Sequence, residues 1–175
     1  MYLLSLTGVK RGLITSRPSK ACKTPYVADV ILDGRDTGEE LCHSPSLGCC
    51  GLAEKGKEVI LSELSSDGKT KCSHRVELAI LREDRNPERE IIIGINPKLG
   101  ETIAELCLQK NCILGLTNIQ SYRRETKLMN SRFDFTGIDE EGREFQNVCL
   151  SKDNQMKGII IYFHTKEGTP VYIYK

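Results

Sequence analysis

Tryptophan is absent from this chain, and aromatic residues make up only 6% of it. Recognition of single-stranded nucleic acid by stacking is therefore weakly supported, with Tyr26 and Tyr122 as the available candidates. No apolar run approaches the roughly 20 residues that span a bilayer. The short apolar start precedes Lys10 and Arg11, which reverses the charge order of a signal peptide. We expect a soluble, intracellular protein that does not bind membranes.

No Cys-x-x-Cys pair occurs among the eight cysteines, so the usual spacing of a structural zinc site is missing. Cys107 and Cys149 lie in apolar segments, where a reduced thiol packs as a small hydrophobic side chain. Reduced, buried thiols are the favoured interpretation. The alternatives are a disulfide framework and a metal site formed by four neighbouring residues, Cys42, His43, Cys49 and Cys50.

Neither sign of charge dominates, since the net charge is only +1. Overall charge therefore neither supports nor excludes binding to nucleic acid, and only local clusters are informative. Basic residues gather at 10–23, where no acid occurs, at 69–75 and at 123–132. Contacts with phosphate rather than with bases are the favoured interpretation, and ordinary solvated charges are the alternative. The candidate nucleic-acid contacts are Lys10, Arg11, Arg17, Lys20, Lys71, Arg75, Arg124, Lys127 and Arg132.

The first half of the chain contains short strand-like segments separated by turn signals such as Asp33-Gly34. These segments are 2–6, 12–15, 26–32, 59–64 and 75–81, with a bend expected at Lys10 and Arg11. No helical pattern lies between them. Short strands at this spacing predict a small antiparallel β-barrel in residues 1–83.

The composition changes near Arg82, and the charged segment 83–90, which contains Pro87, is interpreted as a linker. Residues 100–109 carry apolar residues at helical spacing, and 129–135, 145–150 and 158–163 have strand patterns. A second domain, residues 84–175, is therefore expected to be a mixed sheet with at least one helix. The predicted fold class is α+β.

Three carboxylates, Glu125, Asp134 and Glu144, stand among basic and amide side chains between residues 122 and 150. Carboxylate oxygens are the ligands preferred by Mg²⁺ and Mn²⁺, and such a cation neutralises charge during phosphodiester hydrolysis. Asp134 and Glu144 on neighbouring strands would hold one ion, with Glu125 assisting. The alternative for each acid is a solvated surface position beside a basic neighbour, such as Arg132 beside Asp134.

The segments Arg-Glu-Thr-Lys at 124–127, Asn-Ser-Arg-Phe-Asp-Phe at 130–135 and Asn-Val-Cys-Leu at 147–150 resemble motifs of the sugar fermentation stimulation protein family. Weaker similarities lie at 26–30, 43–48 and 71–78. The resemblance implies an OB-like barrel followed by a restriction-endonuclease-like domain of the PD-(D/E)xK type. It also implies that Glu125, Asp134 and Glu144 bind the metal, and it places Gln146 where the family has a catalytic lysine.

Gln146 can hydrogen-bond a water molecule but carries no charge and cannot act as a base. We therefore expect a DNA-binding protein on a nuclease-like fold with weak or lost catalysis. A Mg²⁺- or Mn²⁺-dependent DNA endonuclease is the first alternative. A protein-interaction or assembly module is the second. The family has a longer segment with a helix where this chain has only 151–157, which would leave an apolar edge for a partner or a second copy.

Overall fold

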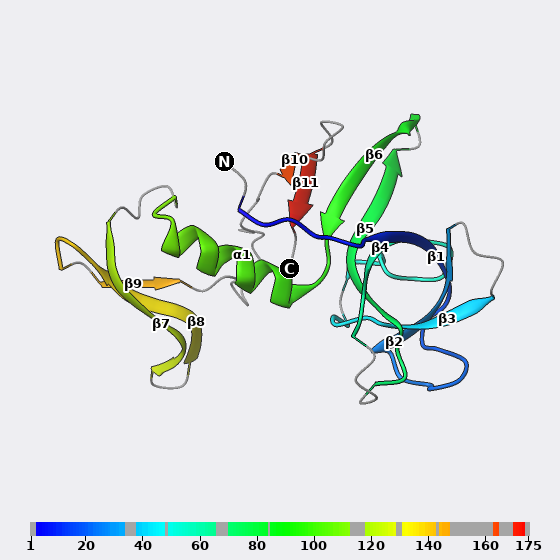
Figure 1. Ribbon diagram of the computed structural model, residues 1–175, viewed down its shortest axis with the longest axis horizontal. Helices are drawn as coiled ribbons and strands as arrows, with labels where there is room; N and C mark the ends of the chain where they lie inside the picture. Colours follow the sequence, from blue (N-terminus) through cyan, green and yellow to red (C-terminus); the bar gives the residue numbers. More distant parts are fainter. Residues whose placement is uncertain are drawn as a thin grey trace. The chain divides into compact units, whose positions relative to one another are not determined.

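The computed structural model shows two compact units, a larger one formed by Leu6–Pro97 with Ile160–Lys175 and a smaller one formed by Met1–Ser5 with Lys98–Ile159 (Figure 1). The structure describes residues 3–33, 38–47, 49–65, 70–83, 85–112, 118–128, 131–142, 144–147, 163–164 and 170–173. Most of these residues are in strands. No helix within these ranges is long and apolar enough to cross a membrane.

Five strands of the larger unit are paired in a closed ring. Antiparallel pairing joins β1 to both β2 and β4, β2 to β3, and β4 to β5. The remaining pair, β3 with β5, is parallel. The expectation of short strands is confirmed, but a wholly antiparallel arrangement is wrong, because β4 pairs with β1 and leaves the edge of β3 to β5. The strands are β1 (Lys10–Ser16), β2 (Val27–Leu32), β3 (Glu39–His43), β4 (Glu58–Glu63) and β5 (His74–Glu83).

The first strand begins later than the sequence pattern predicts. Residues 3–7 are not in a strand, whereas Lys10 and Arg11, expected at a bend, lie inside β1. Lys10 is the Cα partner of Leu61 in β4. Residues 3–7 are therefore not a strand of the ring. The basic residues Lys10 and Arg11 instead pair with β4.

The segment interpreted as a linker forms a hairpin and the first half of β6 (Asn86–Gly94), which pairs antiparallel with β5. Ion pairs at the surface, together with the backbone pairing to β5, hold this charged segment in a regular strand. Glu90 receives two hydrogen bonds from Arg11, at 2.8 and 2.7 Å, and lies 2.7 Å from Arg82. These guanidinium groups lower the pKa of the Glu90 carboxyl, with Arg11 as the main cause. The expected domain boundary between residues 83 and 84 thus falls within the larger unit.

Two further strands extend the sheet of the larger unit. They are β10 (Phe163–His164) and β11 (Pro170–Ile173), which pair antiparallel with each other. Strand β11 also pairs in parallel with β6, so the sheet is mixed. The predictions for residues 148–162, including Cys149 and the short connection 151–157, lie outside the described residues.

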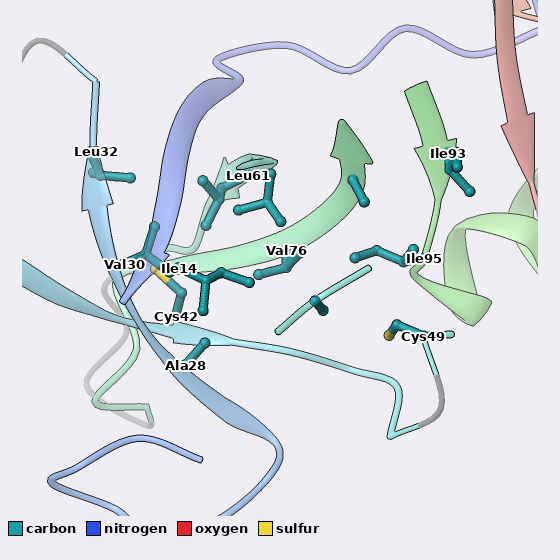
Figure 2. Close-up of a cluster of buried hydrophobic side chains, with 13 residues drawn as sticks. Ile14, Ala28, Val30, Leu32, Cys42, Cys49, Leu61, Val76, Ile93 and Ile95 are labelled. Atoms are coloured by element: carbon teal, nitrogen blue, oxygen red, sulfur yellow. The ribbon is translucent and has the colours of Figure 1, made fainter. Parts of the chain in front are cut away.

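The core of the larger unit consists of the inward-facing residues of the ring. Figure 2 shows Ile14, Val30, Leu61 and Val76 converging from four strands, and all four are completely buried. Gly12 permits the close approach of β1 to β2. A Cβ atom at Gly12 would lie 2.6 Å from the Val30 side chain and 2.9 Å from the Ile31 carbonyl oxygen. Only glycine fits there without displacing the neighbouring strand.

The smaller unit packs helix α1 (Pro97–Gln109) against an antiparallel sheet of β7 (Ile119–Leu128), β8 (Ser131–Asp139) and β9 (Glu144–Asn147). The predicted helix at 100–109 is confirmed. Pro97 at the first helical position costs no hydrogen bond, and Asn111 after the last turn adopts a left-handed φ of 50°. Ala104 and Leu108 pack on Phe135, which is fully buried.

The seven described cysteines are free, which agrees with reduced thiols. Cys42 and Cys49 are buried, and Cys107 is half-buried. Cys22, Cys50 and Cys112 are exposed, so the expectation of buried thiols holds for only part of the set. No cluster of three or more His, Cys, Asp or Glu side chains that would hold a metal ion occurs in the described ranges, and this includes residues 42–50.

One buried carboxylate connects three parts of the larger unit. Glu77 in β5 is only 1% exposed. Its carboxylate accepts hydrogen bonds from Ser62 of β4 at 2.6 Å, Arg75 at 2.8 Å and Asn96 at 2.6 Å. Its backbone carbonyl accepts from the amides of Ile95 and Asn96. Glu77 therefore fixes the segment that follows β6 against β4 and β5.

We expect Glu77→Ala to lower the free energy of unfolding by about 3 kcal/mol, because it leaves the buried Asn96 amide and the Arg75 charge without their acceptor. Urea unfolding followed by circular dichroism measures this loss. Glu63→Ala on β4 is the control, since the Glu63 side chain is 67% exposed and should cost about 0.5 kcal/mol or less. Equal losses in the two variants would contradict the proposed role of Glu77.

Candidate nucleic-acid interface and metal site

The three candidate metal ligands lie on the small sheet but are not gathered at one point. Glu125 of β7 and Asp134 of β8 are opposite each other, since their neighbours pair as Arg124 with Phe135 and as Thr126 with Phe133. Glu144 of β9 is the Cα partner of Ile138. Ile138 is four residues beyond Asp134 on β8, which corresponds to about 13 Å along a strand.

Gln146 occupies a rung between those of the two acids. Its Cα partner is Thr136, which lies midway along β8 between Asp134 and Ile138, the partner of Glu144. Gln146 is therefore nearer in register to Asp134 than Glu144 is. Glu144 and Gln146 keep the Glu-x-Gln spacing on β9. Of the two, Glu144 lies farther from Asp134. The assignment of Glu125, Asp134, Glu144 and Gln146 to a catalytic site stays a prediction.

The backbone at Glu125 interrupts the regular alternation of β7. Glu125 is exposed and has a φ of 52°, a left-handed conformation that is unfavourable for a residue with a side chain. Arg124 lies over the ring of Phe135, at 5.6 Å from its centroid. Thr126 instead bonds through its hydroxyl to that of Thr136 at 2.8 Å. The side chains before and after Glu125 thus lie on opposite faces of the sheet.

The small sheet consequently has two unlike faces. One packs on α1 through Phe135, which contacts Tyr122 edge-on with ring centroids 6.2 Å apart. The other, here called the far face, carries Asp134 and Thr136, the two neighbours of Phe135 in β8. Arg123 joins the far face because it is the Cα partner of Thr136. Asp134 is half-buried there.

Most of the basic residues selected from the larger unit are engaged in internal contacts. Arg11 is held by Glu90, and Lys20 contacts Glu39 at 2.9 Å. Arg75 contacts Glu77 at 2.8 Å. Each of these contacts neutralises a basic side chain that the sequence analysis had selected as a candidate phosphate contact.

Two further basic residues of the larger unit are also engaged. Arg17 donates to the carbonyl oxygens of Pro25, Ser46 and Ala53, so its guanidinium joins separate loops. The amino group of Lys10 lies 3.4 Å from Nε2 of the buried His74. Both side chains thus contribute to structure before any ligand binds.

Arg124 in the smaller unit has a structural environment as well. Its guanidinium donates to Glu105 at 2.9 Å and to Glu101 at 3.3 Å, both on α1, and it covers the ring of Phe135. The two carboxylate contacts connect β7 to the helix, and the ring contact connects it to β8.

Lys71, Arg123 and Lys127 are exposed, and their side chains form no hydrogen bond or ion pair with another described residue. Lys127 is the Cα partner of Arg132, which places two basic residues opposite each other near the end of the β7–β8 hairpin. Arg123 belongs to the basic cluster 123–132 but was not among the individual candidate contacts chosen from the sequence. The signal that identifies it is its strand neighbour Arg124, since one of two adjacent residues in a strand must point away from the helix.

No protein-family model and no curated protein sequence matches this chain. Among solved structures, the chain is similar to SfsA from Pyrococcus furiosus in complex with Ca²⁺, with a TM-score of 0.62 at 16% sequence identity. The match covers 83% of this chain and 55% of that chain, so this chain spans about half the length of that structure. The similarity shows a distant SfsA-like fold, which agrees with the resemblance seen in the sequence motifs.

We expect Arg124→Ala to lower the free energy of unfolding by about 1 kcal/mol, through lost contacts with Glu105 and the ring of Phe135. Arg123→Ala, one residue away on the opposite face, should change it by less than about 0.5 kcal/mol. Urea unfolding of both variants, measured side by side, checks the difference. A larger loss for Arg123→Ala would show that the assignment of the two faces is wrong.

Proposed function

We propose that this protein binds DNA through phosphate contacts centred on the β7–β8 hairpin, on a nuclease-like fold whose catalysis is weak or lost. The observation that carries the proposal is the set of exposed charges on this hairpin, Arg123 and Lys127, which have no partner among the described residues. An antiparallel ribbon of two strands also fits the major groove of DNA, where it would lie close to both phosphate backbones. Binding of this kind has little preference for sequence.

The finer description of the fold belongs to this proposal. The ring of β1–β5, with its parallel contact between β3 and β5, supports an OB-like barrel. The helix packed on a small antiparallel sheet, together with the fold similarity to SfsA, supports a restriction-endonuclease-like second domain. We place its candidate cation site on the far face, where Asp134 lies two residues along β8 from Thr136, the Cα partner of the exposed Arg123.

The fit of a divalent cation can be judged from the oxygen donors of the described residues. Glu125 and Asp134 stand opposite each other and offer hard carboxylate ligands, which suit Mg²⁺, Mn²⁺ or Ca²⁺. Glu144 stands about 13 Å away along the sheet and does not complete the set. We propose that Glu125 and Asp134 bind a cation weakly, and SfsA from Pyrococcus furiosus, solved with Ca²⁺, is the precedent for this fold.

A bound cation would supply charge neutralisation at a phosphate group and a water of lowered pKa. Asp134 would hold the ion, and the neighbouring Arg123 would attract the phosphate of the bound strand. No group in the described part of this surface matches the lysine that the family resemblance requires. A Mg²⁺- or Mn²⁺-dependent endonuclease is therefore the second candidate, favoured by two acids at opposite register positions of β7 and β8, Glu125 and Asp134. A partner or second copy at the C-terminal edge stays a prediction.

The double variant Arg123→Ala/Lys127→Ala should weaken binding to duplex DNA of any sequence. Loss of two phosphate contacts should reduce the slope of log K against log salt concentration by about 2. Fluorescence anisotropy across a range of salt concentrations measures both quantities. Lys55→Ala, an exposed lysine of the larger unit, is the control. Unchanged affinity and slope in the double variant would reject the hairpin as the interface.

Asp134→Ala should abolish heat release on titration with Mn²⁺, because it removes the half-buried carboxylate of the proposed pair. DNA binding without metal should persist in this variant. An assay for cleavage of plasmid DNA with Mn²⁺ separates the two candidate functions. If the natural chain cleaves plasmid DNA and Asp134→Ala does not, the endonuclease is favoured. A gain of cleavage in Gln146→Lys would show that the missing lysine at position 146 limits catalysis.

A further inference from the structure

Two cysteines lie on separate segments that are both held by neighbouring strands, β2 and β3. Cys22 belongs to the turn 19–23 between β1 and β2, and Cys72 belongs to the segment 70–73 that leads into β5. Cys22 is exposed, Cys72 is partly exposed, and both are free thiols in the structure. The function proposed above involves neither of them.

The turn 19–23 is seated on β2. The backbone amide of Ser19 donates to the carbonyl of Val27 at 2.9 Å, and the amide of Lys20 donates to the Asp29 carboxylate at 2.9 Å. The amide of Lys23 returns to the carbonyl of Ser19 at 2.8 Å, which closes one turn around Cys22. The position of Cys22 is therefore set by the middle of β2.

The same turn also reaches the next strand, because the Lys20 amino group contacts Glu39 of β3 at 2.9 Å. Strand β3 also holds the second segment. The amide of Ser73 donates to the carbonyl of Leu41 in β3 at 3.0 Å, and the Ser73 hydroxyl contacts Glu40 in the same strand. Cys72 directly precedes Ser73. Both segments are thus held by hydrogen bonds to β2 and β3.

The two attachment points are immediate neighbours in the sheet, since Asp29, which holds the turn, is the Cα partner of Leu41, which holds Ser73. Burial raises the pKa of the Cys72 thiol, a hydrogen bond with Thr70 lowers it, and the charge on Cys22 raises it. The register of β2 and β3 thus places the two cysteine-bearing segments at neighbouring positions of the sheet, and the pKa of Cys72 agrees with this placement.

We propose that Cys22 and Cys72 form a reversible disulfide that joins the turn 19–23 to the segment 70–73. The exposed Cys22 thiolate attacks a low-molecular-weight disulfide, forms a mixed disulfide and releases one thiolate. Cys72 then loses its proton to solvent, attacks the Cys22 sulfur and releases the second thiolate. Two protein thiols are oxidised and one small disulfide is reduced to two thiols.

The neighbouring Cys42 is excluded from this exchange by its position. Its side chain is completely buried in the core, and burial raises the pKa of its thiol to about 12. It therefore keeps its proton and has no access to an oxidant. The sulfur chemistry at this place is restricted to the two cysteines at the surface.

The test uses the reduced full-length chain and oxidised glutathione as the probe. After oxidation, free thiols are blocked at acidic pH and the chain is cleaved by trypsin. Cleavage after Lys20, Lys23, Lys71 and Arg75 releases peptides 21–23 and 72–75. We expect these two peptides to be linked in the mass spectrum at no less than ten times the amount of any other linked pair, and to separate on reduction.

Cys22→Ser and Cys72→Ser should each eliminate the linked species, and Cys50→Ser, an exposed cysteine elsewhere in the larger unit, should leave it unchanged. A glutathione adduct on Cys22 with an unmodified Cys72 would overturn the proposal. Linkage of Cys22 to a different cysteine, or between two chains, would do the same. The result for the natural chain decides the question even where Cys72→Ser does not fold.

Discussion

The larger unit depends on one buried carboxylate, that of Glu77. A charge at 1% exposure is costly to desolvate, and it persists only because three donors converge on it. Those donors come from β4, from β5 and from the segment after β6, so the charge is satisfied only when all three are in place. The apolar core makes the ring stable, whereas Glu77 determines where the chain leaves it.

The same need for pairing explains why clusters of basic residues in the sequence were a poor guide to a binding surface. A guanidinium group on a ring of short strands lies near several acids. Arg11 forms an ion pair with Glu90, and Arg75 forms one with Glu77, and both pairs are favourable without any ligand. Phosphate would have to displace these carboxylates. Net charge and local clustering count charges but do not show which are already neutralised. Three-dimensional pairing leaves the side chains of Lys71, Arg123 and Lys127 without a partner among the described residues, and the last two share the β7–β8 hairpin.

Features with a local cause were predictable from the sequence. The helix was predicted by its 3.6-residue period, and several strands by their apolar patterns and turn residues, whereas β7 and β11 were not predicted. The strand β6 was missed, because its charged first half is held by backbone pairing and an ion pair with β5 and by an ion pair with β1, which is distant in sequence. The left-handed backbone at Glu125 was also missed. Its surroundings contain neither glycine nor a turn signal, so only the packing of Arg124 on α1 and of Thr126 on Thr136 accounts for it.

The candidate metal site shows why spacing in sequence is not spacing on a sheet. Glu144 comes ten positions after Asp134 in the sequence, but the pairing of β8 with β9 decides how far apart the two acids lie. With Phe135 opposite Asn147, the second acid falls four residues from Asp134, whereas residue 146 falls only two away, at about 7 Å along the strand. The place best suited to assist Asp134 is thus occupied by an uncharged glutamine. Under the proposed function, the glutamine at position 146 and the displacement of Glu144 would act in the same direction, toward a surface that binds phosphate without cleaving it.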